Sequence, residues 1–355
     1  MPNTIACINA IGTAVPGHDI HHAFIAWARE RVEDVRLRAL FDRMAARSGI
    51  SHRWSVLPQD ISPVEPGGFY ADPVLPGTAA RMTLYAEHAP ALAMQAIDDL
   101  AGRADLAGVT HLVVASCTGF VAPGIDQIIA ARMGLSGSVE RLLVGFMGCY
   151  AAVAALRSAY HIVRSDPAAR VLVVTVELST LHLIDTPEIE ALLAMLQFGD
   201  GAAAALVTAE QSGFAIDTPF AATLPESSDL ITWTIGDQGF AMHLSGEVPA
   251  RIAHALADPA LIATMTGGMP PADIDGWAVH AGGRSILDSV EKGLELAQDA
   301  LFDSRAVLDA FGNMSSATLM FVLARMLDGP PVRRGVALAF GPGLAAEGFA
   351  FRSAP

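Results

Sequence analysis

Cys149 is the residue of this sequence that is best placed to act as a nucleophile. It follows the apolar run LLVGFMG (142–148), which predicts a strand, and precedes AAVAALRSAYHIV, which predicts an apolar helix from about Ala151. At such a turn the unpaired N–H groups of the helix N-terminus stabilise a thiolate and can donate to a developing oxyanion. The flanking Gly145 and Gly148 permit a sharp turn. Because free cysteines are also common as small buried hydrophobes, the position alone leaves a structural role open.

His280 and Asn313 occupy similar positions in the second part of the chain. His280 ends the predicted strand in WAVHAGG, and Asn313, in FGNMSSAT, opens a predicted helix. Because the carboxyl ends of parallel strands converge on one crevice, we expect both side chains to approach Cys149. A histidine beside a cysteine can hold it as a thiolate, and a histidine and an asparagine amide can both donate to an enolate or thioester oxygen. Taken singly, the histidine could be structural and the asparagine an ordinary helix cap.

The elements that must position these residues follow an α/β rhythm. Apolar runs that predict buried parallel strands alternate with helical patterns in both parts of the chain, so two similar α/β halves are expected. The expected strands are HLVVASC (111–117), LLVGFMG (142–148), VLVVTVE (171–177), FGDGAAAALVT (198–208), GWAVHAG (276–282) and GVALAFGPG (335–343), and the expected helices lie around 126–133, from about Ala151, at about 285–301 and at 315–327.

Residues 210–213 are the most linker-like point between the two parts. A boundary there gives an N-terminal half, residues 1–212, that carries the candidate nucleophile, and a C-terminal half, residues 213–355, that carries the histidine and the asparagine. The length of 355 residues agrees with two units of roughly 150 residues each.

The composition argues against several classes of protein. Hydrophobic residues make up 52% of the chain and charged residues 17%, which excludes a disordered protein. The formal net charge of -15, together with the lack of a Lys/Arg-rich run, argues against nucleic acid as a partner. The chain begins with no basic segment followed by a long apolar stretch, and no run of ~18 apolar residues occurs in it. We therefore expect neither an export signal nor membrane insertion.

The cysteines indicate a reducing compartment. Cys7, Cys117 and Cys149 lie far apart and form no CxxC pair, which fits neither a disulfide framework nor a zinc site. We therefore expect a cytoplasmic protein without a bound metal.

Motifs along nearly the whole chain closely resemble those of the chalcone synthase-like type III polyketide synthases: GFMGCYAA, WAVHAGG, GNMSSAT, FGDGAAA and AFGPGLAAE. The order and spacing of Cys149, His280 and Asn313 match the catalytic triad of that family. The resemblance implies a thiolase-like fold, with two related α/β halves in an αβαβα layered arrangement, and a homodimer. It also implies an acyltransferase that uses coenzyme A (CoA) thioesters, with no acyl carrier protein and no metal or redox cofactor.

The resemblance further implies a mechanism. The Cys149 thiolate, maintained by His280, takes the acyl group of a starter acyl-CoA. Malonyl-CoA then loses carbon dioxide, and its enolate, stabilised by His280 and Asn313, attacks the Cys149 thioester. Repetition of this decarboxylative Claisen condensation, followed by cyclisation, would yield a polyketide.

Two further pairs of residues match substrate-binding positions of the family. Phe198 matches a gatekeeper phenylalanine between the CoA tunnel and the cavity, and Met242 in GFAMHL takes the second gatekeeper position, where plant enzymes usually have phenylalanine. Arg43 and Arg47, one helical turn apart, match residues that hold the CoA phosphates; without the resemblance they would be ordinary surface arginines.

A third basic position of the plant enzymes has no counterpart in this chain. It falls near Leu40, so the phosphate grip is expected to be weaker or arranged differently. Arg53 is a candidate substitute.

The expected cavity residues match bacterial rather than plant members of the family. They are Cys117 in SCTGF, Ser179 and His182 in VELSTLH, Trp233, and Ser315 after the triad asparagine. Cys117 and the GFMGCYAA motif resemble the tetrahydroxynaphthalene synthases, which use malonyl-CoA as both starter and extender, and this subtype is preferred. Cys117 could equally be a small buried residue of its strand.

Several alternatives stay open. A pyrone or resorcinol synthase primed by a fatty acyl-CoA would need an extra apolar tunnel, and the bulk of Trp233 argues mildly against it. A ketoacyl-ACP synthase III would share the fold and the triad but would receive malonyl on a carrier protein. A thioester hydrolase or a silent subunit would share the fold without elongation, although the intact triad speaks against silence. The sequence leaves the starter, the number of extensions and the cyclisation undetermined.

Overall fold

The strands of the chain join into one long mixed sheet to which both halves of the sequence contribute. The computed structural model describes residues 4–59, 63–71 and 74–355. Within these residues nine strands are hydrogen bonded in the order β11-β12-β13-β8-β1-β7-β6-β4-β5. Their bounds are Ala6–Ala14 (β1), His111–Ser116 (β4), Glu140–Gly145 (β5), Val171–Leu178 (β6), Asp200–Thr208 (β7), Phe214–Thr223 (β8), Gly276–Val279 (β11), Gly335–Gly341 (β12) and Ala345–Ser353 (β13).

β1 and β8 connect the two parts of this sheet. They pair antiparallel between residues 6–8 and residues 214–216. The linker-like residues 210–213 form the turn between β7 and β8, where Gly213 takes a positive φ of 73°. The boundary at residue 212 stays a prediction, since the sheet itself continues across it.

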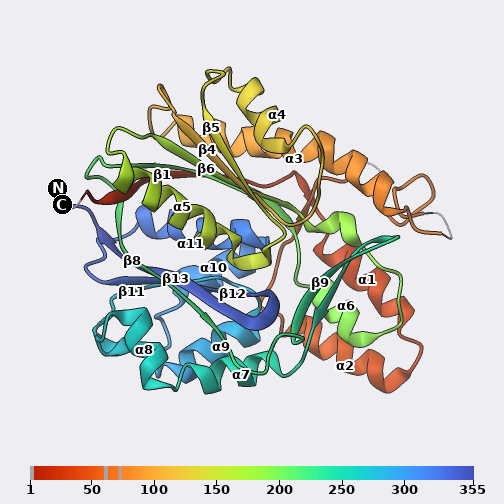
Figure 1. The fold of residues 1–355 in the computed structure, drawn as a ribbon. Coiled ribbons are helices and arrows are strands. Elements are labelled where there is room, and N and C mark those ends of the chain that lie inside the picture. Colours follow the sequence, from red (N-terminus) through yellow and green to blue (C-terminus); the bar gives the residue numbers. More distant parts are fainter. Residues whose placement is uncertain (1–3, 60–62, 72–73) are drawn as a thin grey trace.

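Helices cover both faces of the two parts of the sheet (Figure 1). Helices lie between the parts and also cover the outer faces, so the order of layers is αβαβα, as expected for a thiolase-like fold. The middle layer holds α5 (Ala151–Ser165) and α11 (Ser316–Leu327), one outer layer holds α3 (Thr78–Ala101) and α4 (Ile125–Arg132), and the other holds α7 (Val248–Ala255), α8 (Pro259–Thr266) and α9 (Arg284–Gly293).

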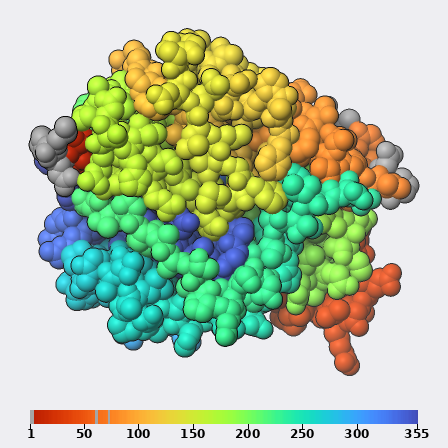
Figure 2. Space-filling model, in the orientation of Figure 1, coloured from red at the N-terminus to blue at the C-terminus, as the bar shows by residue number. Residues whose placement is uncertain are grey.

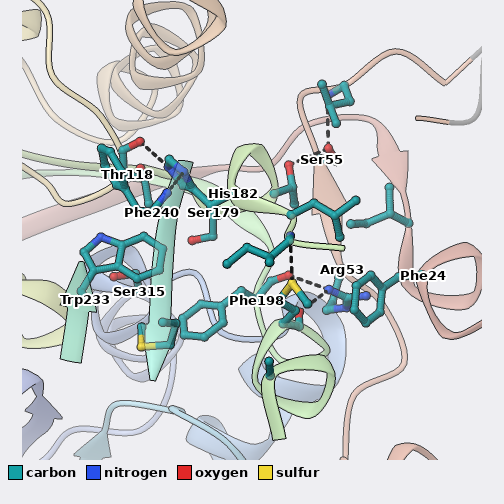
Figure 3. Close-up of a pocket in the computed structure, with 18 of the residues that line it drawn as sticks. Phe24, Arg53, Ser55, Thr118, Ser179, His182, Phe198, Trp233, Phe240 and Ser315 are labelled. Atoms are coloured by element: carbon teal, nitrogen blue, oxygen red, sulfur yellow. Dashed lines mark hydrogen bonds between the residues drawn. The ribbon is translucent and has the colours of Figure 1, made fainter. Parts of the chain in front are cut away.

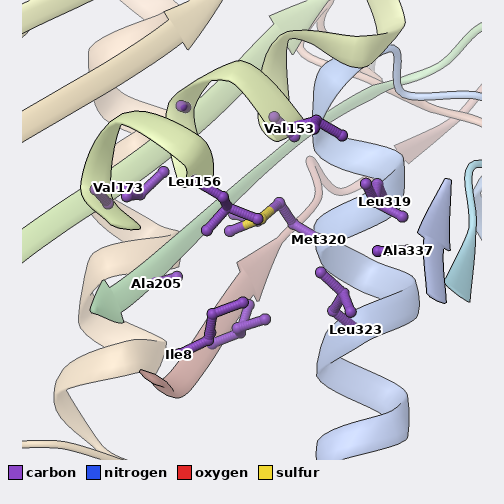
Figure 4. Close-up of a cluster of buried hydrophobic side chains, with 14 of the residues drawn as sticks. Ile8, Val153, Leu156, Val173, Ala205, Leu319, Met320, Leu323 and Ala337 are labelled. Carbon is purple, nitrogen blue, oxygen red and sulfur yellow. The ribbon is translucent and has the colours of Figure 1, made fainter. Parts of the chain in front are cut away.

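An apolar core fills the middle layer (Figure 4). Val153 and Leu156 of α5 and Met320 and Leu323 of α11 are buried here together with Ile8 of β1. Most other residues on α5 that face this core are alanines, which let the helix approach the sheet closely. Since α5 is buried along most of its length, the turn that precedes it has a rigid base.

The sheet is mixed, although a parallel one was predicted. β4 pairs parallel with β5 and with β6, and β11 pairs parallel with β12, as expected. β1, β7, β8 and β13 pair antiparallel with their neighbours. β5 also differs from its prediction as a buried strand, because it is an edge strand whose residues are mostly exposed.

Several predicted elements end earlier than expected, and a left-handed residue explains the end of two of them. The strand expected over 142–148 leaves the sheet after Gly145, because Phe146 takes a positive φ of 57°. The helix expected over 285–301 ends at Gly293, and Glu295 beyond it takes a left-handed conformation with φ 51°, which cannot continue a helix. A separate helix, α10 (Phe302–Phe311), follows.

A small helical unit and a hairpin complete the fold beside the layers. The helical unit consists of α1 (His21–Arg31), α2 (Val35–Ala46) and α6 (Ile189–Met195). Figure 2 shows its orange-red part projecting at the lower right of the molecule. The hairpin of β9 (Ile231–Gly236) and β10 (Gly239–Leu244) forms a two-stranded sheet of its own. The helical unit has a separate apolar core that includes Phe24, Trp27, Phe41, Leu192 and Leu196.

Candidate active site

Cys149 lies in a tight turn between β5 and α5. Phe146 and Gly148 have positive φ angles of 57° and 75°, and Cys149 follows in the short 3-10 helix Gly148–Tyr150, directly before α5. A Cβ atom on residue 148 would lie 2.3 Å from Cδ of Pro342, so this position has room only for glycine. The turn places the thiol at the N-terminal end of a long apolar helix, where N–H groups point towards it.

Burial dominates the electrostatics of the Cys149 side chain. Burial raises the pKa of the Cys149 thiol from its ordinary value of 9.0 to about 12, and the nearby Glu177 carboxyl raises this pKa too. Hydrogen bonds from the Ser315 and Asn313 side chains act in the opposite direction, because they stabilise the thiolate. The change in pKa corresponds to about 4 kcal/mol in favour of the thiol. Burial therefore favours the neutral thiol over the thiolate.

His280 follows the last residue of β11 and is buried. Its backbone N–H donates to the carbonyl oxygen of Leu338 on β12 at 2.8 Å. Neither of its ring nitrogens has a hydrogen-bond partner among the described residues. Burial lowers the pKa of His280 to about 3, so the imidazole is neutral and has a free nitrogen that can accept a proton.

Asn313 links the loop after His280 to the thiol. Its Nδ2 donates to the carbonyl oxygen of Gly282 at 3.2 Å, and its side chain also hydrogen bonds to Cys149. Its Oδ1 accepts from the backbone N–H of Ser315 at 2.8 Å, which fixes the orientation of the amide. The structure thus brings Asn313 and Cys149, from the two halves of the sequence, into contact.

A cavity that is partly open to solvent lies beside the thiol. Cys149 is part of its wall. His280 and Asn313 do not line the cavity. Asn313 lies one layer behind its wall, where it hydrogen bonds to Cys149. The structure gathers in this wall all the side chains that the sequence predicted for a cavity: Phe198, Met242, Cys117, Ser179, His182, Trp233 and Ser315.

Phe198 is joined through its backbone to the catalytic segment. It forms a parallel β-bridge with Asn313. On either side of it, the Gly199 N–H donates to the Asn313 carbonyl oxygen at 3.0 Å, and the Asn313 N–H donates to the Gln197 carbonyl oxygen at 2.8 Å. The predicted gatekeeper and the predicted amide donor are therefore held as one unit.

Hydrogen bonds fix the wall around Cys117. His182 Nδ1 accepts from the Phe240 N–H at 3.1 Å, so its Nε2 carries the proton and donates to the Thr118 carbonyl oxygen at 2.7 Å. Burial lowers the pKa of His182 to about 4, and the neutral ring stacks on Phe240 with centroids 4.3 Å apart. Trp233 Nε1 donates to the Cys117 carbonyl oxygen at 2.9 Å. The β9–β10 hairpin is thereby tied to the loop after β4.

Cys117 combines the two roles that the sequence left open. It lines the cavity, and its Sγ accepts a hydrogen bond from the Gly148 N–H at 2.9 Å. Burial raises the pKa of the Cys117 thiol well above its ordinary value. Its sulfur thus stabilises the turn that presents Cys149.

The cavity continues beyond Phe198 into the helical unit of α1, α2 and α6. Figure 3 shows Phe198 between Trp233 and Ser315 on one side and Phe24 and Arg53 on the other. We call this extension the apolar arm. It was missed in the sequence because its residues come from separate segments that carry no shared motif. Its apolar residues are Ile20, Ala23, Phe24, Trp27, Leu57, Pro63, Val64, Leu183, Ile184, Ala191 and Met195.

Arg53 lies in the wall of this arm, and the expectation that it holds a CoA phosphate is wrong. It is buried. Its Nε donates to Nδ1 of His21 at 3.1 Å, and its Nη1 donates to the carbonyl oxygens of Phe198 at 2.7 Å and Met195 at 3.1 Å. A guanidinium fixed inside the protein by these acceptors cannot reach a phosphate at the surface.

Arg43 and Arg47 lie at the end of α2, outside the cavity. Both are exposed, and Leu40, at the position of the missing third cation, is partly exposed on the same helix. The assignment of these arginines to CoA phosphates stays a prediction.

Glu177 is a site residue that the sequence analysis missed. It lies wholly buried on β6, and its carboxylate accepts from the Cys117 N–H at 2.9 Å, from the Thr118 hydroxyl at 2.9 Å and from the Ser316 hydroxyl. Burial raises the pKa of Glu177 to about 7. The one charged side chain in the otherwise apolar run VLVVTVE was a signal that could have identified it.

Metal sites and membrane spans were also sought in the described residues. No group of three or more His, Cys, Asp or Glu side chains there could hold a metal ion. None of the helices in this part of the chain is long and apolar enough to cross a membrane.

Comparison with known proteins relates the whole chain to one family. Residues 2–211 match the N-terminal domain of the chalcone and stilbene synthases, and residues 216–355 match their C-terminal domain. Pks18 from Mycobacterium tuberculosis and Mycobacterium bovis, described as alpha-pyrone synthesis polyketide synthase-like, is 33% identical over 99% of this chain and 92% of its own length.

Solved structures share the fold. PKS-I from the brown alga Ectocarpus siliculosus matches with a TM-score of 0.88 and 29% identity, over 99% of both chains. The C-terminal type III polyketide synthase domain of Steely1, a type I/III hybrid from Dictyostelium, matches with a TM-score of 0.90 over 99% of this chain and 100% of that domain. At 24% identity, this second likeness concerns the fold alone. The layered α/β fold expected from the sequence is confirmed.

We predict that Glu177→Gln accelerates the alkylation of Cys149. Glu177 loses its proton as the pH rises through about 7, and its negative charge then opposes the Cys149 thiolate. Without that charge, iodoacetamide should modify Cys149 roughly three- to tenfold faster at pH 8. The rate is measured by mass spectrometry of the Cys149 peptide.

Asp200→Asn is the matched control. Burial also raises the pKa of Asp200 to about 7, but its hydrogen bonds go to Val56 and Thr180 rather than to the groups around the thiol. Equal alkylation rates in the Glu177 variant and the unmodified protein would contradict the prediction.

Proposed function

Because this chain belongs to the chalcone and stilbene synthase family, and is therefore a type III polyketide synthase and an acyltransferase, we propose that it primes Cys149 with an apolar acyl group and extends that group with malonyl-CoA. The observation that carries this proposal is the cavity, which has the thiol in its wall and continues into the apolar arm. An acyl chain bound to the sulfur can lie along that arm without exposing its methylene groups to water.

In the priming step, Cys149 attacks the carbonyl carbon of the starter acyl-CoA. The thiol proton passes to the free ring nitrogen of His280, since the thiol and the imidazole are both neutral at rest. Opposite charges that form together in a medium of low dielectric attract each other, so this transfer costs less than creating either charge alone. The N–H groups before α5 donate to the oxyanion, and CoA leaves as the thiol after it takes the proton from the imidazolium.

In the extension step, malonyl-CoA loses carbon dioxide by cleavage of the bond between its carboxylate and its methylene carbon. The enolate oxygen that remains accepts hydrogen bonds from Asn313 Nδ2 and from the imidazole of His280. The enolate carbon then attacks the Cys149 thioester, and the Cys149 sulfur leaves. The extended chain is returned to Cys149 for a further cycle.

We propose an α-pyrone as the product class. After two extensions, an enol oxygen of the chain can attack the terminal thioester carbonyl, which closes a six-membered lactone and releases the chain. Such closure needs no additional catalytic group. It needs only a cavity in which the chain can fold back on itself. The relative Pks18 carries alpha-pyrone synthesis in its name, which supports this choice.

A malonyl-primed aromatic compound such as tetrahydroxynaphthalene is the second candidate product. Cys117 in the cavity wall favours it, since the sequence around this residue resembles the tetrahydroxynaphthalene synthases. Trp233 is fixed by its hydrogen bond to the Cys117 carbonyl oxygen, and its indole ring narrows the cavity beside Cys117. The two products are distinguished by the starter that the enzyme accepts.

We propose that the active form is a homodimer joined along β5. The outer edge of β5 has no partner strand within the described chain, and its Leu142 and Leu143 are 44% and 41% exposed. The exposed Phe120 lies close to Gly145, the last residue of this strand. An edge strand with apolar side chains is a natural site for pairing with a second copy. The free cysteines fit a cytoplasmic location for the enzyme.

Product analysis tests the proposed function. The purified protein receives malonyl-CoA, alone or with acetyl-, hexanoyl-, lauroyl- or palmitoyl-CoA, and mass spectrometry identifies the products. We expect alkylpyrones from the longer starters. An aromatic product from malonyl-CoA alone would establish the second candidate instead. If every mixture yielded only acetyl-CoA or free malonate, synthase function would be refuted.

A pair of variants on α1 tests the role of the arm. Ala23→Phe should lower kcat/KM for lauroyl-CoA by roughly tenfold, because Ala23 lines the arm, and should leave acetyl-CoA unaffected. Ala26→Phe is the control, because Ala26 is exposed on the same helix, as Ala23 is, but lies outside the cavity lining. Equal effects of both variants on lauroyl-CoA would argue against an acyl chain in the arm.

We predict that Cys149→Ala abolishes condensation but leaves slow decarboxylation of malonyl-CoA. His280 and Asn313 remain able to stabilise the enolate, whereas no sulfur holds the starter. Carbon dioxide and acetyl-CoA should still form while the polyketide product disappears. Cys7→Ala, in a buried cysteine on β1, is the control that should retain the product. Elongation by the Cys149 variant would dismiss that residue as the chain carrier.

For the dimer, we predict that Leu143→Asp gives a monomer. A carboxylate on β5 opposes pairing of the two edges, and sedimentation velocity should show a mass near 37.1 kDa in place of a dimer. Phe302→Asp, at an apolar side chain that is 65% exposed elsewhere on the surface, should leave the dimer intact. A dimer in both variants would place the interface elsewhere.

A further inference from the structure

We propose that Arg284 binds a phosphate group of CoA and supplies the third cation of the phosphate grip that Arg43 and Arg47 begin. The proposal rests on the proposed function, since it concerns how the same site holds the nucleotide end of its CoA thioesters. It names a residue outside the motifs that carry the family resemblance.

The backbone places Arg284 beside the gate of the cavity. It is the first residue of α9 and lies four positions after His280. Gly283, just before it, is packed so closely that a Cβ there would lie 2.0 Å from Oε1 of Gln197, the residue that precedes Phe198. The loop from His280 to Arg284 therefore runs from the catalytic centre past the gatekeeper.

On its other side, Arg284 contacts the end of α2. Its Nη1 donates to the carbonyl oxygen of Arg47 at 3.3 Å. Its side-chain carbons Cβ and Cδ lie 3.7 and 3.8 Å from where a Cβ of Gly49 would be. The guanidinium thus lies next to the exposed segment that carries Arg43 and Arg47. A CoA thioester that places its acyl group at Cys149 and its phosphates at the end of α2 would therefore pass Arg284.

The charges around Arg284 leave it available for an anion. Its closest carboxylate is Asp288, in a loose contact of 3.6 Å, and its side chain is 51% exposed. Arg305 occupies the same carboxylate more tightly, at 2.7 Å, and also binds Glu291 at 2.7 Å. The carboxylate of Asp309 accepts from the Ser51 hydroxyl at 2.6 Å. Arg305 therefore neutralises acidic groups that would otherwise compete with a phosphate.

A third cation is needed at this place for electrostatic reasons. The chain has a formal net charge of -15, so a polyanionic substrate is repelled unless cations gather where its phosphates lie. Leu40 stands at the position where a basic residue is missing, and Arg53 is buried. An exposed guanidinium can form paired hydrogen bonds with phosphate oxygens. The N–H groups at the N-terminus of α9 also attract an anion.

Calorimetric titration of CoA and of pantetheine, which lacks the nucleotide and its phosphates, tests the proposal. Arg284→Gln should weaken binding of CoA by about tenfold and leave binding of pantetheine unchanged. With malonyl-CoA as the substrate, KM should rise by a similar factor and kcat should stay the same. Arg284→Lys, which keeps the positive charge, should retain part of the affinity. Arg333→Gln is the control, because Arg333 is exposed and pairs with Asp275 away from this loop.

Unchanged affinity of Arg284→Gln for CoA would overturn the proposal. A parallel loss of pantetheine binding would overturn it too, since the variant would then have disturbed the tunnel rather than the phosphate contact. Failure of the proposed function is distinguishable, because it would appear as the lack of a polyketide product in the unmodified enzyme, whatever its affinity for CoA.

Discussion

The burial of one thiol is the constraint on which the rest of this structure depends. Cys149 can be buried because α5 and α11 fill the middle layer with small and apolar side chains, and because Gly148 lets the chain turn against Pro342. In such surroundings each hydrogen bond is strong and each unpaired charge is costly. The donors on Asn313 and Ser315 therefore have a large effect on a sulfur that is almost wholly buried.

The same constraint explains why the buried carboxyl groups nearby are each paired with several donors. Glu177 is surrounded by three donors, which partly offset the cost of burying a carboxyl. Asp200 plays a similar part further along the cavity, where its carboxylate accepts from the Val56 N–H and from both the N–H and the hydroxyl of Thr180. It joins segments that come from distant parts of the sequence and lie beside the arm. The ring nitrogens of His280 stand out because they lack such partners.

Local pattern was enough to predict the turn at Cys149 and the two α/β halves, because each depends on short apolar runs. The αβαβα layers and the residues of the cavity wall were expected only from the resemblance of whole motifs to one family. The apolar arm was not predictable in this way, since Phe24, Trp27 and Met195 meet only after the helical unit packs. Arg53 was misplaced because sequence does not show whether an arginine is buried. β5 was expected to be buried because its apolar run resembles that of a covered strand, whereas it lies at the edge of the sheet with its leucines partly exposed.

The β-bridge between Phe198 and Asn313 limits how this enzyme can change during evolution. In the proposed mechanism, a substitution that shifts the backbone at Phe198 also shifts the Asn313 amide assigned to the enolate, so selectivity at that point could not drift without a loss of rate. Met242 has no such backbone link, because it lies on a hairpin that forms its own small sheet, whereas Trp233 opposite it donates to the Cys117 carbonyl oxygen. Natural diversity of products in enzymes built like this one should therefore accumulate on the hairpin while the bridge stays fixed.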